Sequence, residues 1–214
     1  LLDAIRNDLA RPPIHARNLF HISAMMYDAF VINNKVINSI SSSPYLLNKT
    51  IDDIHYNFEY PQKFSFDEDA LNKIISFSAY NFLIHRFKNS IKSAVTLHRI
   101  DSMMINLDYD FNFSGLDYLS GDPRSIGNYL SKLYIEYGYN DNSNEINNYV
   151  NNYYKPINPP LNPELPGNPD LIDPNRWQSI FLEEFIDQSG NLIQGVPDFI
   201  SPEWGNVLPF ALLQ

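Results

Sequence analysis

The spacing of hydrophobic residues predicts helices along most of the chain up to Gly138. Leu1 to Leu9 forms a short helical stretch that ends at Arg11-Pro12-Pro13, and Pro13 suits the first turn of a second helix. This second helix runs from about Ile14 to about Ile32, and its apolar residues cover most of its circumference, so we expect a buried central helix. Those residues are Ala16, Leu19, Phe20, Ile22, Met26, Tyr27, Phe30 and Val31.

Three more helices are predicted further along the chain. One begins behind an Asp67 cap and ends near Asn89, and a single apolar stripe from Leu97 to Phe111 indicates the next. Gly121-Asp122-Pro123 is a typical helix start, and we expect the helix that it opens to stop at Gly138. Residues 33–65 are rich in Asn, Ser and Asp, which predicts a long ordered loop with room for a helical turn.

The remainder of the chain has a different character. Residues 139–180 are rich in Asn and Pro, which excludes regular helix and central strand, and recurring tyrosines and leucines favour an ordered wrap over a disordered linker. We expect these anchors to be Tyr149, Tyr153, Tyr154, Leu161, Leu165, Leu171 and Ile172. Residues 181–186 and 192–194 flank turn residues and predict one small hairpin.

The predicted fold class is therefore mainly α: a helical bundle with a long Asn/Pro-rich irregular C-terminal wrap and one candidate small β-hairpin. Residues 1–214 form either a single mainly helical domain or the N-terminal portion of a larger one, with 1–138 helical, 139–180 irregular and 181–214 holding the hairpin. The chain opens at Leu1 and closes in the apolar run 209–213, so we expect both termini to be cut.

Composition narrows the functional classes. The 214 residues include 15 Lys and Arg against 25 Asp and Glu, a net charge of −10 that argues against nucleic acid and anionic membranes as partners. No apolar run approaches the roughly 20 residues of a membrane-spanning helix, so no transmembrane segment is predicted. The absence of cysteine excludes disulfides and permits an extracytoplasmic location without requiring one. A homo-oligomer is compatible with this composition.

One polar stripe crosses the apolar surface of the second predicted helix. Arg17, His21 and Asp28 stand four and seven residues apart, so they share one face. The functional interpretation is that they line or buttress an anion or substrate pocket, with His21 as proton carrier and Asp28 orienting it. The structural interpretation, a buried charge network or a solvated face, is favoured roughly three to one.

Other candidate chemistry is weaker. The remaining histidines lack the spacing of metal ligands, so neither zinc nor another metal site is predicted. Residues 141–145 are oxygen-rich but lack the glycine of a calcium loop, which favours a polar turn. No nucleophile elbow or phosphate loop is present, and the adjacent acids Glu183 and Glu184 point to opposite faces of a strand.

Several short motifs resemble the vanadium-dependent haloperoxidase-like proteins of the type 2 phosphatidic acid phosphatase superfamily. They begin with 1–8, Arg11-Pro12, 15–21 and 26–30, and they continue along most of the chain. The later ones are Gly121-Asp122-Pro123, Gly127-Asn128-Tyr129, Asn158-Pro159-Pro160-Leu161, 173–178, Pro202-Glu203-Trp204-Gly205 and 209–212.

The resemblance implies a helical-bundle enzyme that binds vanadate, or phosphate in the phosphatases, through Lys and Arg side chains, a Ser-Gly-His loop and a histidine. Those residues lie towards the family's C-terminal half. Here Arg11-Pro12 does not qualify, because the position that would carry the lysine is Ala4, and no Ser-Gly-His is present. No catalytic residue can be carried over, and the stripe Arg17, His21 and Asp28 stays at most a buttress.

Two hypotheses of different classes remain open. In the first, the chain is the N-terminal scaffold of a vanadate-dependent haloperoxidase-like enzyme or related phosphatase, and the remainder of its own chain supplies the pocket. In the second, it is a non-catalytic interaction or structural protein derived from that scaffold. Vanadate needs several converging positive donors, and the basic residues here are dispersed, so we expect this segment alone to bind no vanadate and to be inactive.

Overall fold

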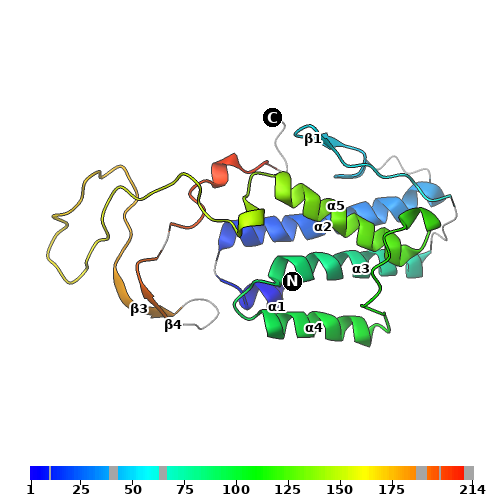
Figure 1. Ribbon diagram of the computed structural model, residues 1–214, viewed down its shortest axis with the longest axis horizontal. Coiled ribbons are helices and arrows are strands. Elements are labelled where there is room, and N and C mark those ends of the chain that lie inside the picture. The colour runs from blue at the N-terminus through cyan, green and yellow to red at the C-terminus, as the bar shows by residue number, and fades with distance from the viewer. Residues whose placement is uncertain (10, 39–42, 63–66, 187–191, 198, 210–214) are drawn as a thin grey trace.

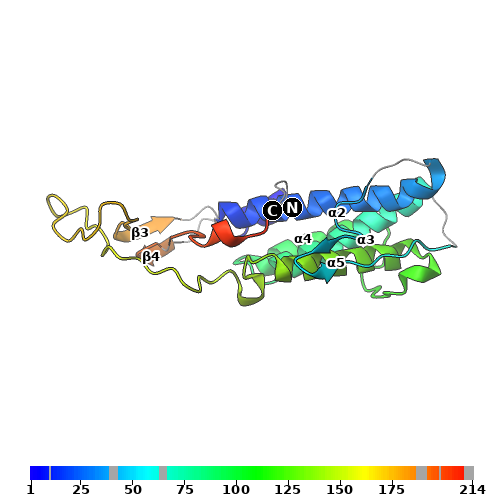
Figure 2. The same ribbon diagram turned by 90° about the horizontal axis from the view of Figure 1, so that it is seen from above.

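The computed structural model describes residues 1–9, 11–38, 43–62, 67–186, 192–197 and 199–209. Within them, α2 packs against α3 and α5, α3 also packs against α5, and α4 lies on α3 (Figures 1 and 2). The mainly α prediction is confirmed. The five α-helices are α1 (Leu2–Arg6), α2 (Pro12–Asn38), α3 (Glu68–Phe87), α4 (Ser93–Asn106) and α5 (Pro123–Asn140).

Both predicted helix caps are confirmed. The Asp67 carboxylate accepts a hydrogen bond from the Ala70 amide at 2.7 Å, and Asp122 accepts one from the Arg124 amide at 2.9 Å. The predicted stop at Gly138 is wrong, because α5 continues to Asn140. A Cβ at Gly138 would lie 2.8 Å from Nη2 of Arg17, so the glycine permits a close approach of side chains rather than ending the helix.

The longest helix, α2, is not buried on all sides as its sequence suggested. Leu19, Met26, Tyr27 and Phe30 are each 40 to 44% exposed and lie along one outer face. The opposite face carries Ile22, Met25, Ala29 and Ile32 into the core, together with the predicted polar stripe. Along the described residues, no helix combines the length and hydrophobicity needed to cross a bilayer.

The segment predicted as a long loop contains structure that its sequence did not reveal. Helix α2 extends through Asn38, and a short antiparallel hairpin joins β1 (Thr50–Ile51) to β2 (Ile54–His55). Its turn uses Asp52 and Asp53 with φ of 50° and 64°, where Asn-Gly is the commoner signal. Leu46, Leu47, Tyr56 and Phe58 pin this segment onto the core, and each is at most 2% exposed.

The described residues between 150 and 197 form an arm that projects from one end of the bundle instead of wrapping around it (Figures 1 and 2). Residues 201–209 return to the bundle, where the Leu208 amide donates to the Asp141 carbonyl at 2.9 Å. Strand β3 (Leu182–Ile186) pairs antiparallel with β4 (Leu192–Gly195) in the region where the sequence suggested a hairpin. The residues between the two strands, 187–191, lie outside the described part of the chain. The predicted irregular character of 139–180 is also found, with the 3₁₀ turn η2 (Glu145–Asn147) inside it.

The expected hydrophobic anchors of this arm are largely wrong. Tyr153 is 81% exposed and Ile172 67%, and Leu165 and Leu171 are also exposed, whereas Tyr149, Tyr154 and Leu161 are partly buried. The Asn158 side chain holds the arm instead. Its Nδ2 donates to the carbonyls of Asp173 and Arg176 at 2.8 and 2.9 Å, and its Oδ1 accepts from the amides of Ile172 and Asp173.

Candidate functional site

A cluster of charged and polar side chains lies buried where α2, α3 and the end of α5 meet. Helices α2 and α3 contribute cationic and imidazole groups, and the segment after α5 contributes carboxylates and a phenol. The charged side chains and the imidazoles are at most 14% exposed. We call the ion cluster the set Arg17, His21, His85, Arg86, Asp141, Glu145 and Tyr149.

Glu145 is the centre of the ion cluster. Its carboxylate accepts hydrogen bonds from Nη2 of Arg17 and Nε2 of His85, both at 2.8 Å, and from Nη1 of Arg86. Arg17 also donates from Nε to Asp141 at 2.5 Å and from Nη2 to the Gly138 carbonyl at 2.9 Å. Each buried guanidinium therefore faces at least one carboxylate, which compensates for the loss of hydration.

Burial and charge set the protonation of this cluster. Burial alone would raise the pKa of Glu145, but the hydrogen bond from His85 and the charges of Arg86 and Arg17 lower it to about 2. Burial, together with the positive charges of Arg17 and Arg86, holds the pKa of His21 well below its ordinary value of 6.5. Arg86 donates from Nη2 to Nδ1 of His21 at 3.0 Å, so the neutral ring carries its proton on Nε2.

The structure brings together two of the three residues of the predicted stripe. Arg17 and His21 both belong to the ion cluster, but Asp28 lies two turns further along α2. The Asp28 carboxylate accepts from the amides of Tyr45 and Leu46 at 2.5 and 2.9 Å and from the Tyr134 hydroxyl at 3.0 Å. Asp28 therefore anchors the segment after α2, and this geometry does not fit the hypothesis that it orients His21.

Sequence reasoning missed most of the ion cluster. His85 and Arg86 drew no functional assignment, and Asp141 and Glu145 were interpreted as parts of a polar turn. The expectation that the basic residues are dispersed is wrong for Arg17 and Arg86, which share one carboxylate. No periodicity rule joins residues about 60 and 130 positions apart, so only the fold could reveal this set.

The residues of the ion cluster do not fit vanadate or phosphate. A trianion needs several positive donors whose charge is not already balanced. Here the Arg17 and Arg86 guanidinium groups are matched by Asp141 and Glu145, and the Glu145 carboxylate occupies the point where their donors converge. Among the side chains that the structure describes, no group of three His, Asp or Glu is arranged to hold a metal ion.

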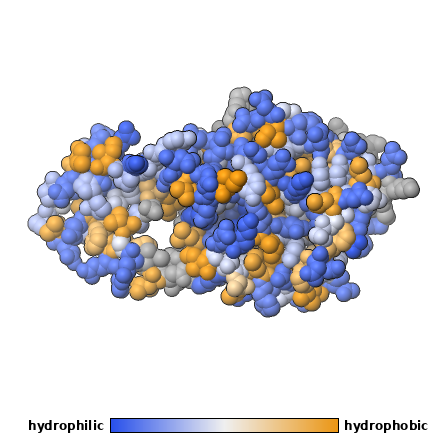
Figure 3. All heavy atoms as spheres, viewed as in Figure 1, coloured by the Kyte–Doolittle hydropathy of each residue, from blue (hydrophilic) through white to orange (hydrophobic). Residues whose placement is uncertain are grey.

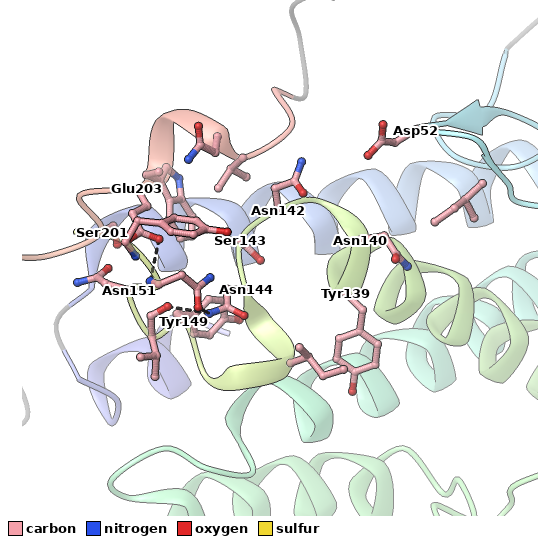
Figure 4. A pocket seen from close by; sticks show the side chains of 18 residues that line it. Asp52, Tyr139, Asn140, Asn142, Ser143, Asn144, Tyr149, Asn151, Ser201 and Glu203 are labelled. Carbon is pink, nitrogen blue, oxygen red and sulfur yellow. Dashed lines mark hydrogen bonds between the residues drawn. The ribbon is translucent and has the colours of Figure 1, made fainter. Parts of the chain in front are cut away.

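A cavity of about 520 Å³ lies beside the ion cluster, and Tyr149 belongs to both (Figure 4). In Figure 4, Asn140, Asn142 and Tyr139 lie on one side of the hollow and Asn144 and Tyr149 on the other. Four aromatic residues line it: Tyr139, Tyr149, Tyr153 and Trp204. Six asparagines line it as well: Asn140, Asn142, Asn144, Asn151, Asn152 and Asn206.

The walls of this cavity have an unusual backbone. Tyr149 and Ser201 adopt φ of 63° and 52°, and neither residue type is favoured in the left-handed region. Asn142 and Asn144 also have positive φ there, which asparagine tolerates well.

No family model, curated protein or solved structure matches the chain. No residue role is therefore transferred from a relative. The functional conclusions depend on the geometry of the ion cluster and the cavity, on the exposed surfaces of the molecule, and on the sequence motifs described above.

Proposed function

We propose that this chain is the scaffold portion of a vanadate-dependent haloperoxidase-like or related phosphatase protein whose catalytic pocket is supplied by residues outside it. The observation that carries the proposal is the neutralisation of Arg17 and Arg86 by Asp141 and Glu145. Buried cations that are already paired leave no net positive charge for a trianion, and the removal of one partner would strongly destabilise the fold. The ion cluster is then a structural element that joins α2, α3 and the segment after α5.

The resemblance motifs support a scaffold role, because their side chains make structural contacts. Asn128 accepts from Asn81 at 2.7 Å and donates to the Gly115 carbonyl at 3.0 Å, which ties α5 to α3 and the preceding loop. Asn158 joins two motif segments of the arm. Glu203 accepts from the amides of Asn152 and Tyr153 at 3.0 and 2.5 Å.

The exposed surfaces also support a chain that packs against further protein. Leu19, Met26, Tyr27 and Phe30 form an apolar stripe along the outer face of α2. Hydrophobic residues, in orange in Figure 3, gather on the arm as well as on the bundle. Exposed apolar stripes of this kind typify surfaces that are covered by another protein segment.

The second candidate function, a non-catalytic interaction protein, is favoured by the arm in particular. Val150, Tyr153, Ile157, Ile172 and Ile186 are each at least 50% exposed there, and side-chain hydrogen bonds from Asn158 hold the backbone at Ile172. An arm that presents several exposed apolar side chains is suited to a protein partner. The two proposals differ in whether the protein segment that packs against this chain carries catalytic residues.

The first experiment assays the purified 214-residue chain for bromide oxidation with added vanadate and hydrogen peroxide, with free vanadate as the control. We expect no rate above the control, no hydrolysis of p-nitrophenyl phosphate, and an unshifted vanadium NMR signal. Turnover by this chain, or vanadate held by its side chains, would refute the scaffold proposal.

A second observation separates the two candidates. The coding sequence that follows Gln214 is read for a Lys and Arg-Pro element, a Ser-Gly-His loop and a later Arg and His pair. If they are present, a longer chain that includes them is expected to oxidise bromide. If the longer chain lacks them or stays inactive, the interaction protein is the better description.

A further inference from the structure

We propose that the cavity beside the ion cluster binds an uncharged carbohydrate, a single pyranose or a short oligosaccharide. The cavity is open on one side and is lined by the end of α5, by residues 142–153, by the β1–β2 hairpin and by the 3₁₀ turn η3 (Trp204–Asn206) (Figure 4). Its volume of about 520 Å³ falls within the roughly 300 to 1,000 Å³ of typical small-molecule sites.

The polar lining matches hydroxyl groups. A carboxamide both donates and accepts hydrogen bonds, as a sugar hydroxyl does, and asparagines line the cavity from three separate parts of the chain. Ser143 adds a buried hydroxyl to the same wall (Figure 4). Ser143 is 6% exposed, and its Oγ has no hydrogen-bond partner among the described atoms. This Oγ has almost no accessible surface, so the exposed carboxamides of the lining, and not this hydroxyl, would contact a sugar.

The apolar lining suits the other face of a sugar. Tyr149 and Trp204 lie with ring centroids 6.4 Å apart, and both line the cavity, as do Tyr139 and Tyr153. A pyranose presents C–H groups on its ring faces and hydroxyls at its edges, so it packs on large flat side chains that also carry a polar tip. Aromatic rings and amides in one cavity therefore match both sides of such a ligand.

Charge distinguishes a sugar from an anion. Among the described residues that line the cavity, none is Lys, Arg or His, and two are acidic, Asp52 and Glu203. The Glu203 carboxylate already accepts from the amides of Asn152, Tyr153 and Tyr154, and Asp52 is exposed at the rim. The chain also has a net charge of −10. An anionic ligand is therefore repelled, and a neutral one is not.

The test uses the two tryptophans of the chain. Trp177 stacks on Phe199 in the arm, with centroids 4.8 Å apart, and Trp204 lines the cavity. In the Trp177→Phe variant, Trp204 alone reports by fluorescence. This variant is titrated with glucose, galactose, mannose, N-acetylglucosamine, cellobiose and maltose, and with choline and inorganic phosphate. We expect the Trp204 fluorescence to change and to saturate with at least one sugar below about 10 mM, which is ten times a dissociation constant of about 1 mM.

Two variants locate the response in this cavity. Asn206→Ala and Asn151→Ala, each in the Trp177→Phe background, are expected to weaken sugar binding about fivefold or more, which is the loss of one hydrogen bond. Asn112→Ala is the matched control, since Asn112 is exposed and does not line the cavity. Asn151 and Asn206 are both exposed, so neither change is expected to unfold the chain.

Three outcomes would overturn the proposal. The first is the absence of a saturable response to every sugar. The second is a response to choline or to phosphate alone, which would identify a charged ligand. The third is that the Asn206→Ala variant binds the sugar as tightly as the Asn112→Ala variant does, because the sugar would then lie elsewhere.

Discussion

The helical bundle and the C-terminal arm are held by different kinds of polar contact. In the bundle, ionised side chains on different helices meet in the interior, as Arg17, Arg86 and Glu145 do. In the arm, a neutral amide, Asn158, binds backbone groups that lie 14 to 19 residues away. The pairing in the bundle interior is therefore sensitive to protonation, and the contacts of Asn158 are not.

This difference follows from how the backbone of each region finds its hydrogen-bond partners. The helices satisfy their own backbone groups, so their interior side chains are free to pair with one another. The arm has almost no regular structure, and its backbone amides and carbonyls need side-chain partners. Deleting a buried charged group of the bundle should therefore destabilise the whole bundle, whereas deleting the Asn158 amide should loosen only the arm.

The largest effect is expected at the centre of the ion cluster. Glu145→Ala leaves Arg17 and Arg86 with a single buried carboxylate, Asp141, and should lower the free energy of unfolding by about 3 to 5 kcal/mol. Urea denaturation followed by circular dichroism measures it. Glu164→Ala, at an exposed position of the arm, is the matched control. A loss below about 1 kcal/mol would mean that the cluster does not hold the bundle together.

A smaller loss is expected for Asp28→Ala. The amides of Tyr45 and Leu46 lose their acceptor, which should cost roughly 1 to 3 kcal/mol of unfolding free energy. Asp28→Asn keeps one acceptor oxygen and should cost less. Thermal denaturation measures both, with the exposed Asp170→Ala as control. An unchanged melting temperature for Asp28→Ala would contradict the anchoring role.

The next effect concerns pH. The folded pKa of His21 lies below 6.5, so the unfolded chain binds a proton that the folded chain does not, and stability is lost as pH falls below 6.5. His21→Gln retains an acceptor for Arg86 but cannot titrate. The unfolding free energy of this variant should therefore depend less on pH, by up to about 1.4 kcal/mol per pH unit. Unfolding is measured between pH 6.5 and 5, and exposed His98→Gln is the control.

Glu145 acts in a lower window. Its pKa falls from 4.5 to about 2 on folding, so a further loss of stability is expected as pH drops through that range, and His21→Gln should leave that loss intact. The His21 prediction is contradicted if the unfolding free energy changes as steeply between pH 6.5 and 5 in His21→Gln as in the unaltered chain. His21 would then not be held neutral in the folded state.

The smallest and most local effect is expected in the arm. Asn158→Ala removes the shared partner of Ile172 and Asp173, and a local loss of one or two kcal/mol should speed exchange of their amide hydrogens about 5- to 30-fold. The unfolding of the bundle should not change. Hydrogen exchange by NMR tests this, with Asn175→Ala as control. A fall in the bundle's unfolding free energy would show that the arm and the bundle are one cooperative unit.

The helices could be predicted because their signals are local. Asp67 and Asp122 cap helices within three residues, and the apolar periods of α3 and α5 appear in consecutive turns. The β1–β2 hairpin and the true extent of α2 were missed, since short strands and Asp-Asp turns carry little local information. The exposure of Tyr27 and Phe30 was missed because composition does not tell which face of a helix is covered.

The sequence by itself determined that the chain is mainly helical, where α3 and α5 begin, and that Arg17, His21 and Asp28 share one face of α2. Only the tertiary structure decided that Arg17 and His21 meet Arg86 and Glu145 while Asp28 meets Tyr45 and Tyr134. Helix periodicity is a property of neighbouring residues. The pairing of buried charges depends on which distant side chains the packing of helices brings within hydrogen-bonding distance.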